Sequence, residues 1–402
     1  MAPHWRTARV MLLCAGVAVG VSMGIRHTSG LFLPPMTQDM GWGREVFALA
    51  LAIQNLVWGA AQPVAGMLAD RYGAGKVILA GSLLYALGTI LMAYSDSGAE
   101  LNLTAGLLIG LGLSGATFSV IFGVIGRATP AQNRTAALTI VSTAGSLGQF
   151  LMVPAGQALI TALGWLDALV ALGLLALIVA PLAFVLSEPH AGGQAGQGTQ
   201  SIRAAVVEAF QHRGFWLLTL GYFVCGFQVV FIGVHLPAFV SDQGMAPSAG
   251  MTALALIGLF NIFGTYVFGL LGVRVSKKYL LSSLYFGRGV VIAIYLAFPI
   301  SPLSTYVFAA AIGFMWLSTV PLTNALVAQI FGVKYLAMLS GFVFFSHQLG
   351  SFLGVWLGGA LFDATGSYAL MWIIAVALGV IAAVLNLPID ERPAHVARSQ
   401  PA

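Results

Sequence analysis

Long stretches of this sequence carry no formal charge, and they constrain the fold more than any other feature. Nine of them have about the 20 residues that an α-helix needs to cross the hydrocarbon core of a bilayer. They are residues 46–69, 77–95, 101–126, 135–166, 168–187, 214–241, 243–273, 335–362 and 364–389. Only 7% of the 402 residues are Asp, Glu, Lys or Arg, whereas soluble domains hold about 25%. The sequence therefore predicts an all-α integral membrane protein.

Two further apolar stretches are each interrupted by one arginine. Residues 10–38 contain Arg26 and are interpreted as one helix. Residues 279–333 contain Arg288 and are too long for a single span, and the sequence Pro299-Ile300-Ser301-Pro302 predicts a turn within them because proline disfavours continuation of a helix. These stretches add three helices, so twelve transmembrane helices are expected.

Basic residues indicate the orientation of the spans. With the N-terminus in the cytoplasm, fourteen of the 17 Lys and Arg residues fall in cytoplasmic segments, and only Arg44 falls in a loop on the opposite side. The fourteen are Arg6, Arg9, Arg71, Lys76, Arg127, Arg134, Arg203, Arg213, Arg274, Lys277, Lys278, Lys334, Arg392 and Arg398. Basic residues concentrate in cytoplasmic loops of membrane proteins. Both termini are therefore predicted to lie in the cytoplasm.

The chain repeats itself around one polar interruption. Residues 147–159 match residues 349–361 at an offset of 202, with eight of 13 positions identical. Matching halves of six helices indicate a duplication around a site near the middle of the membrane. The expected domains are an N-terminal bundle at residues 1–187, a cytoplasmic linker with a short interfacial helix at 188–213, and a C-terminal bundle with a short tail at 214–402.

A loop motif between the second and third expected helices carries a family resemblance. The sequence Gly66-Met67-Leu68-Ala69-Asp70-Arg71-Tyr72-Gly73-Ala74-Gly75-Lys76 resembles the signature loop of the major facilitator superfamily. The resemblance implies two pseudo-symmetric six-helix bundles that rock to give alternating access. It also implies that Asp70 and Arg71 form a cytoplasmic latch, since they can interact with helix ends.

Within that superfamily the chain resembles bacterial monocarboxylate porters and oxalate/formate exchangers. The features concerned are Gly41-Trp42-Gly43-Arg44-Glu45, the pair Arg26-His27, and Arg134-Thr135-Ala136-Ala137-Leu138 followed by Ala144-Gly145. The resemblance implies a bacterial inner-membrane protein in which a cation on the first helix binds a carboxylate. The chain departs from the family in helix 8, which has no ionisable group where relatives often carry an arginine.

The residues themselves favour an anionic ligand. Arg26 and Arg288 lie within expected spans, and no Asp or Glu lies at mid-span. An arginine at membrane depth costs about 2.5–3.5 kcal/mol to insert and usually faces a cavity or a partner. A structural role also stays open, in which Arg26 bonds backbone carbonyls at the interface. The candidate substrate-binding residues are Arg26, His27, Gln54, Gln228, His235, Asn261, Arg288 and His347.

Other classes of function receive no support from motifs. The sequence has no phosphate-binding Gly-Lys loop, zinc motif or catalytic triad pattern, so no enzyme activity, cofactor or metal is expected. The expected partners are a small anionic solute and membrane lipids, with no nucleic acid, and the chain is expected to be a monomer. The main prediction is a secondary carrier of a small organic anion, most simply a monocarboxylate. A carrier or exporter of a larger or neutral solute and a non-transporting sensor are alternatives, and the sequence does not choose between proton symport, exchange and uniport.

Overall fold

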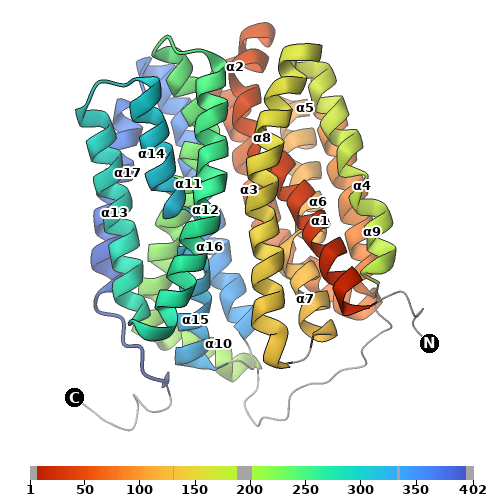
Figure 1. Ribbon diagram of the computed structural model, residues 1–402, viewed down its shortest axis with the longest axis vertical. Helices are drawn as coiled ribbons and strands as arrows, with labels where there is room; N and C mark the ends of the chain where they lie inside the picture. The colour runs from red at the N-terminus through yellow and green to blue at the C-terminus, as the bar shows by residue number, and fades with distance from the viewer. Residues whose placement is uncertain (1–6, 130, 188–201, 333–335, 395–402) are drawn as a thin grey trace.

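The computed structural model describes residues 7–129, 131–187, 202–332 and 336–394, and every regular element in these ranges is a helix (Figure 1). The first half contains α1 (Ala8–His27), α2 (Ser29–Met40), α3 (Arg44–Tyr72), α4 (Ala74–Met92), α5 (Gly98–Leu101), the π-helix η1 (Asn102–Leu108), α6 (Ile109–Ala116), α7 (Phe118–Ala128), α8 (Ala131–Ala176) and α9 (Val179–Val185). The second half contains α10 (Ile202–Gln211), α11 (Arg213–Asp242), α12 (Pro247–Arg274), α13 (Lys277–Ala297), α14 (Pro302–Phe314), α15 (Thr319–Phe331), α16 (Leu336–Thr365) and α17 (Ala369–Asn386).

These helices form twelve membrane spans, as predicted. Eleven segments of the described chain are long and apolar enough to cross a membrane, and one of them, Ala137–Val185, has 49 residues. That segment consists of two helices joined at Gly164, whose φ of 83° lies in the left-handed region that glycine adopts without steric cost. The sequence placed this boundary at Asp167, because a charge marks the end of a span only approximately. The predicted turn between residues 299 and 302 is confirmed, since α13 ends at Ala297 and α14 begins at Pro302.

Four spans are interrupted within their length, which charge spacing did not predict. The first span breaks at Thr28 between α1 and α2, the fourth at Thr117 between α6 and α7, the sixth between α8 and α9, and the tenth between α14 and α15. Hydroxyl groups add hydrogen bonds to the carbonyls at the first break: Thr28 Oγ1 donates to the carbonyl of Ile25 and Ser29 Oγ to that of Arg26, each at 2.7 Å. Irregular backbone at membrane depth is tolerated where the protein buries it.

The sequence repeat appears in the packing of equivalent helices. Gly148 on α8 meets α1 so closely that an added Cβ would lie 1.9 Å from the carbonyl oxygen of Gly20. Its repeat partner Gly350 on α16 meets α11 in the same way, with 1.9 Å to the carbonyl oxygen of Phe223. Small residues allow such close crossings between membrane helices. The two halves are therefore built on the same helix contact.

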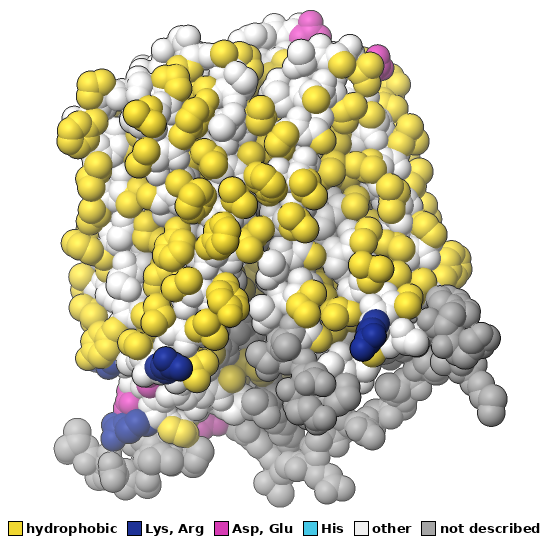
Figure 2. Space-filling view, viewed as in Figure 1, with side chains coloured by type: hydrophobic (Ala, Val, Ile, Leu, Met, Phe, Trp, Pro, Cys, Tyr) yellow, Lys and Arg dark blue, Asp and Glu magenta, His cyan; other side chains and the backbone are white. Residues whose placement is uncertain are grey.

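The two ends of the molecule differ in charge. On the face shown in Figure 2, apolar side chains cover the sides, Lys and Arg lie at the lower end together with some acidic side chains, and the charged side chains at the upper edge are acidic. We call the upper end, where α3 begins and α11 finishes, the Arg44 end, and the lower end, where α3 finishes, the Arg71 end (Figure 1). The helix α10 lies at the Arg71 end, whereas linker residues 188–201 fall outside the described residues. The assignment of the domain boundaries stays a prediction.

Candidate functional site

Arg26 lies at the break in the first span, as the penultimate residue of α1. Its Nη2 donates to Asn55 Oδ1 at 2.6 Å, and its guanidinium carbon lies 4.9 Å from the centre of the Trp58 ring. The buried Nε has no hydrogen-bond partner among the residues that the structure describes. Among the described residues no acidic side chain forms an ion pair with Arg26. The position of Arg26 follows from the local sequence, because Thr28 and Ser29 permit the break that ends α1 beside it.

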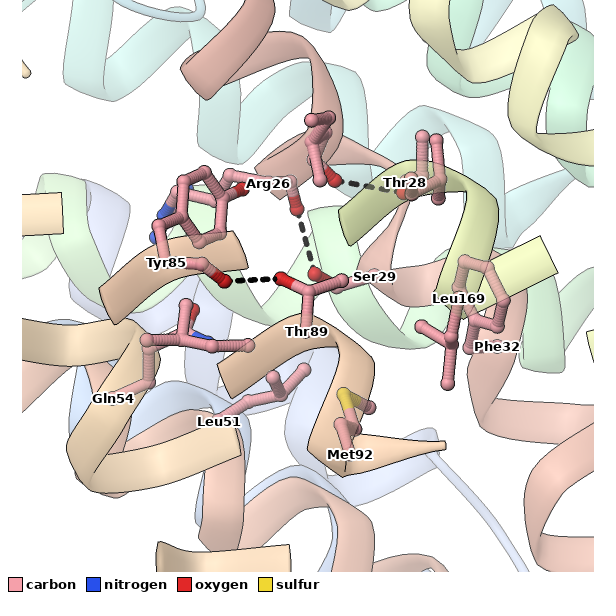
Figure 3. Close-up of a pocket in the computed structure, with 13 residues that line it drawn as sticks. Arg26, Thr28, Ser29, Phe32, Leu51, Gln54, Tyr85, Thr89, Met92 and Leu169 are labelled. Carbon is pink, nitrogen blue, oxygen red and sulfur yellow. Dashed lines mark hydrogen bonds between the residues drawn. The ribbon is translucent and has the colours of Figure 1, made fainter. Parts of the chain in front are cut away.

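Two small hollows meet at Arg26. The first lies inside the N-terminal half, between α1, α2, α3, α4, α6 and α8, and is shown in Figure 3. The second separates α1, α2 and α3 from α11 of the other half. Their cavity volumes are about 20 and 30 Å³, counted as the space that the centre of a water molecule can occupy. On this measure one water needs about 10–15 Å³, so each hollow holds only one to three waters. An organic anion therefore requires the halves to separate further at this place.

Polar side chains are concentrated in these hollows. The first is lined by Arg26, Thr28, Ser29, Gln54, Tyr85 and Thr89 together with apolar residues. Tyr85 donates its hydroxyl to the carbonyl oxygen of Ser22 at 3.1 Å. The second hollow combines Arg26, His27, Ser29, Gln54 and Asn55 with the wall of α11 formed by Val229, Val230, Gly233 and Val234. A ligand between the halves would therefore meet polar groups on one side and an apolar wall on the other.

Three of the eight predicted binding residues come together at the second hollow: Arg26, His27 and Gln54. Gln54 is held in place because its Nε2 donates to the carbonyl oxygen of Ala105 at 2.8 Å. Gln228 and His235 lie elsewhere on α11. Gln228 Nε2 donates to Ala375 O at 2.8 Å, which turns this side chain toward α17.

His235 and His347 are both buried and packed. His235 contacts the hydroxyl of Tyr368 through Nδ1 at 2.9 Å and the carbonyl oxygen of Val355 through Nε2 at 2.8 Å, so both ring nitrogens have partners. His347 stacks on Phe344 with ring centres 5.7 Å apart and contacts Gln348 Oε1 through Nδ1 at 3.1 Å. Neither histidine lines the two hollows described above.

Asn261 bonds across the two halves. Its Nδ2 donates to Ser146 Oγ on α8 at 2.8 Å, while its Oδ1 accepts from the backbone N–H of Leu317 at 3.0 Å and from Thr265 Oγ1 at 3.1 Å. With 1% of its surface exposed, Asn261 joins the halves through these bonds rather than facing a hollow.

Arg288 binds backbone carbonyls inside the C-terminal half. Its Nε and Nη2 donate to the carbonyl oxygen of Met315 at 3.0 and 2.5 Å, Nη2 also donates to the carbonyl of Trp316, and Nη1 donates to Cys225 Sγ at 3.3 Å. These carbonyls follow the end of α14, where a cation interacts favourably with the helix dipole. Arg288 is 1% exposed and lies outside the two hollows. Arg288 therefore supplies hydrogen bonds to carbonyl oxygens at the break between α14 and α15 in the tenth span.

Replacing Arg288 by methionine should therefore lower stability rather than affinity. Each hydrogen bond from a charged donor contributes about 1.5–3 kcal/mol, and methionine keeps an unbranched side chain of part of that length without donating to Met315 and Trp316. We expect a lower melting temperature for purified Arg288→Met, with anion affinity unchanged in the protein that folds. Arg288→Lys should restore part of the stability. A normal melting temperature with lost affinity would instead assign Arg288 to the ligand.

The predicted latch residues lie in the last turn of α3, at the Arg71 end. The side chain of Asp70 is outside the described structure. Arg71 is exposed and lies over the ring of Tyr72, with its guanidinium carbon 5.3 Å from the ring centre. The following residue, Gly73, has a φ of 97°, so the motif requires glycine there to turn the chain into α4.

A network at the opposite end was missed from sequence. Arg44, at the start of α3, makes a two-pronged bond to Asp242 at the end of α11, with Nη1–Oδ2 and Nη2–Oδ1 distances of 2.7 and 2.6 Å. Nη1 also donates to Tyr368 Oη at 3.0 Å, and the guanidinium carbon lies 3.8 Å from the centre of the Phe362 ring. The signal was Arg44 itself, the one basic residue in an expected loop on a side rich in acids.

A second carboxylate reinforces this network. Asp363, near the end of α16, accepts from the backbone N–H groups of Arg44 and Glu45 at 3.0 and 2.8 Å. It therefore caps the N-terminus of a helix in the other half, where negative charge is favourable. Trp356 Nε1 donates to Glu45 Oε1 at 2.9 Å. We call Arg44, Glu45, Asp242, Trp356 and Asp363 the Arg44 network, and it ties the two halves together at the Arg44 end.

Comparisons with known proteins agree with this architecture. The family model described as Major Facilitator Superfamily matches residues 12–354. The chain is 26% identical to an MFS-type transporter of Bacillus subtilis, YcxA, described as uncharacterized, over 94% of each chain. It is 28% identical to mouse monocarboxylate transporter 11, over 91% of this chain and 83% of that protein. Its structure resembles a bacterial homologue of the human lysosomal transporter Spinster, with a TM-score of 0.75 and 16% identity over 96% and 97% of the two chains. The chain is a multi-pass membrane protein that belongs to the Major Facilitator Superfamily.

Proposed function

We propose that this transporter is a secondary carrier of a small organic anion, most simply a monocarboxylate. One observation carries the proposal: Arg26 is a cation within the first span, it lines a hollow between the two halves, and among the described residues it has no acidic partner. A carboxylate would supply the missing negative charge. Arginine suits this task because it stays protonated and offers paired donors that match carboxylate geometry.

The family and the relatives support the same class of substrate. The matched proteins are named transporters rather than enzymes, and several at low identity are named monocarboxylate transporters, including those of mouse and of human. His27 and Gln54 share the second hollow with Arg26 and form the remaining part of the proposed site. The five other predicted binding residues form hydrogen bonds with other protein groups away from the two hollows, and the proposed site does not include them.

The contacts at the two ends of the molecule support a mechanism of alternating access. The Arg44 network joins α3 to α11 and α16 and so closes the Arg44 end. We assign this end to the outside of a bacterial inner membrane and the Arg71 end, with both termini, to the cytoplasm, because basic residues concentrate there. Asp70 and Arg71 would latch the cytoplasmic end in the opposite state. Rocking of residues 1–187 against 214–402 would expose Arg26 to each side in turn.

Uptake by purified protein in liposomes tests the proposal. Labelled pyruvate, lactate, formate and oxalate are supplied outside, with and without a pH gradient and with unlabelled anion trapped inside. We expect saturable uptake of at least one of these acids, and stimulation by the gradient or by the trapped anion separates proton symport from exchange. Transport of neutral solutes such as a vitamin, with no transport of or competition by the four acids, would contradict the proposal.

A further inference from the structure

The group that Arg26 binds in this structure is the side-chain amide of Asn55 on α3. The distance from Arg26 Nη2 to Asn55 Oδ1 is 2.6 Å, and Asn55 is 1% exposed. Asn55 Nδ2 donates to the carbonyl oxygen of Leu51 at 2.7 Å. An amide turned the other way would place its NH₂ group against the N–H donors of the guanidinium. Both bonds therefore hold the amide oxygen toward Arg26.

Asn55 also lies where a ligand between the halves would arrive. It lines the second hollow together with Arg26, and the facing wall on α11 is apolar. The ring of Trp58, one turn after Asn55 on α3, lies by the guanidinium of Arg26. A carboxylate that enters from the second hollow would therefore approach Arg26 on the side where Asn55 already bonds it.

We propose that Asn55 is a specificity-determining placeholder, a neutral acceptor that occupies Arg26 in the empty carrier and yields its place to the substrate carboxylate. This inference rests on the proposed function. A carboxylate carries a full negative charge and has two oxygens that can accept parallel bonds from one guanidinium, whereas an amide offers a single neutral oxygen, so a carboxylate competes better for Arg26 than a neutral solute does. When no substrate is bound, the amide accepts a hydrogen bond from a buried N–H group of Arg26. Without the amide that donor would be unpaired, which costs free energy.

The placeholder is attached to the contact between the halves. The backbone carbonyl of Asn55 accepts from Gln348 Nε2 on α16 at 3.1 Å. One turn later, a Cβ added to Gly59 would lie 2.7 Å from the side chain of Gln348, so α3 and α16 cross closely here. Exchange of the amide for a substrate carboxylate therefore takes place at the helix pair that has to part when the carrier opens.

Replacing Asn55 by aspartate tests this role. Aspartate would give Arg26 a permanent internal carboxylate in the place of the substrate. We expect the melting temperature of Asn55→Asp without added anion to rise, while its affinity for pyruvate and lactate falls about tenfold or more, a change of about 1.4 kcal/mol or more. Asn55→Ala should do the reverse, with a lower melting temperature and affinity at least as high as in the wild type. If Asn55 had only a structural role, both Asn55→Asp and Asn55→Ala would have a lower melting temperature and a lower anion affinity than the wild type.

Two controls accompany these variants. Gln211→Glu makes the same amide-to-acid change at an exposed position of α10, outside the membrane spans, and should leave both quantities unchanged. In the Arg26→Gln background Asn55→Asp should lower the melting temperature, because its carboxylate then has no partner. Tight pyruvate binding by Asn55→Asp would overturn the placeholder and leave the proposed function standing. A wild-type protein that binds none of pyruvate, lactate, formate and oxalate would overturn both.

Discussion

Replacing Arg26 by glutamine should weaken anion binding about tenfold or more and reduce transport with it. A charge-assisted hydrogen bond contributes about 1.5–3 kcal/mol, and about 1.4 kcal/mol corresponds to a factor of ten in affinity. Glutamine can still bond Asn55 but cannot offer two parallel charged donors to a carboxylate. The measurement is the rise in melting temperature of purified wild type and Arg26→Gln as pyruvate or lactate is added.

Arg26→Lys separates the charge of this side chain from its shape. A lysine keeps the positive charge as a point charge without the planar pair of donors, so binding should be rescued only in part. A purely structural Arg26 would give a lower melting temperature and normal affinity in both variants. Stabilisation of Arg26→Gln by pyruvate that equals that of the wild type would remove Arg26 from the binding site.

Breaking the Arg44 network should open the Arg44 end. The double variant Asp242→Asn and Asp363→Asn removes the ion pair to Arg44 and the carboxylate cap on α3. A partly exposed ion pair contributes up to about 1 kcal/mol, and a helix N-cap about 0.5–2 kcal/mol. Conformations of a carrier differ by only a few kcal/mol, so the population open at this end should increase about tenfold.

Distances between spin labels measure this opening. Cysteines at the exposed positions Ala99 and Gln243 place one label on each half at the Arg44 end, in a Cys14→Ala background. We expect double electron–electron resonance to show a longer distance in the double variant than in the parent. Asp390→Asn is the control, because it removes a carboxylate paired with Arg392 away from this end. Unchanged distances in the double variant would show that the Arg44 network does not close the molecule.

The span architecture was predictable because each half obeys rules that act locally along the chain. Charges end the spans, and Pro299 and Pro302 divide the long apolar stretch 279–333 into two helices, so twelve helices and the turn at residues 299–302 followed from sequence. The repeated glycines were also informative. Gly148 and Gly350 sit at equivalent close crossings because only the absence of a side chain allows the helices to approach that far.

The interruptions and the pairing of polar groups could not be predicted in the same way. A break within an apolar span is stable only when side chains satisfy its free carbonyls, and for the tenth span the side chain is Arg288, which is distant in sequence. Asn55 and Arg26 are likewise 29 positions apart. The same applies to the partners of Arg44, which come from α11 and α16. These contacts depend on which faces of the helices pack against one another, and the spacing of residues in a single sequence does not specify this.

The central claim, that Arg26 recognises a carboxylate, is tested most directly by comparing an acid with its own amide. Isothermal calorimetry on the purified wild-type protein at neutral pH would measure binding of lactate and of lactamide, which differ little in size but differ in charge. The account predicts saturable binding of lactate and at least about tenfold weaker binding of lactamide, as expected for loss of one charge-assisted bond. Equal binding of the two, or binding of lactamide alone, would contradict it.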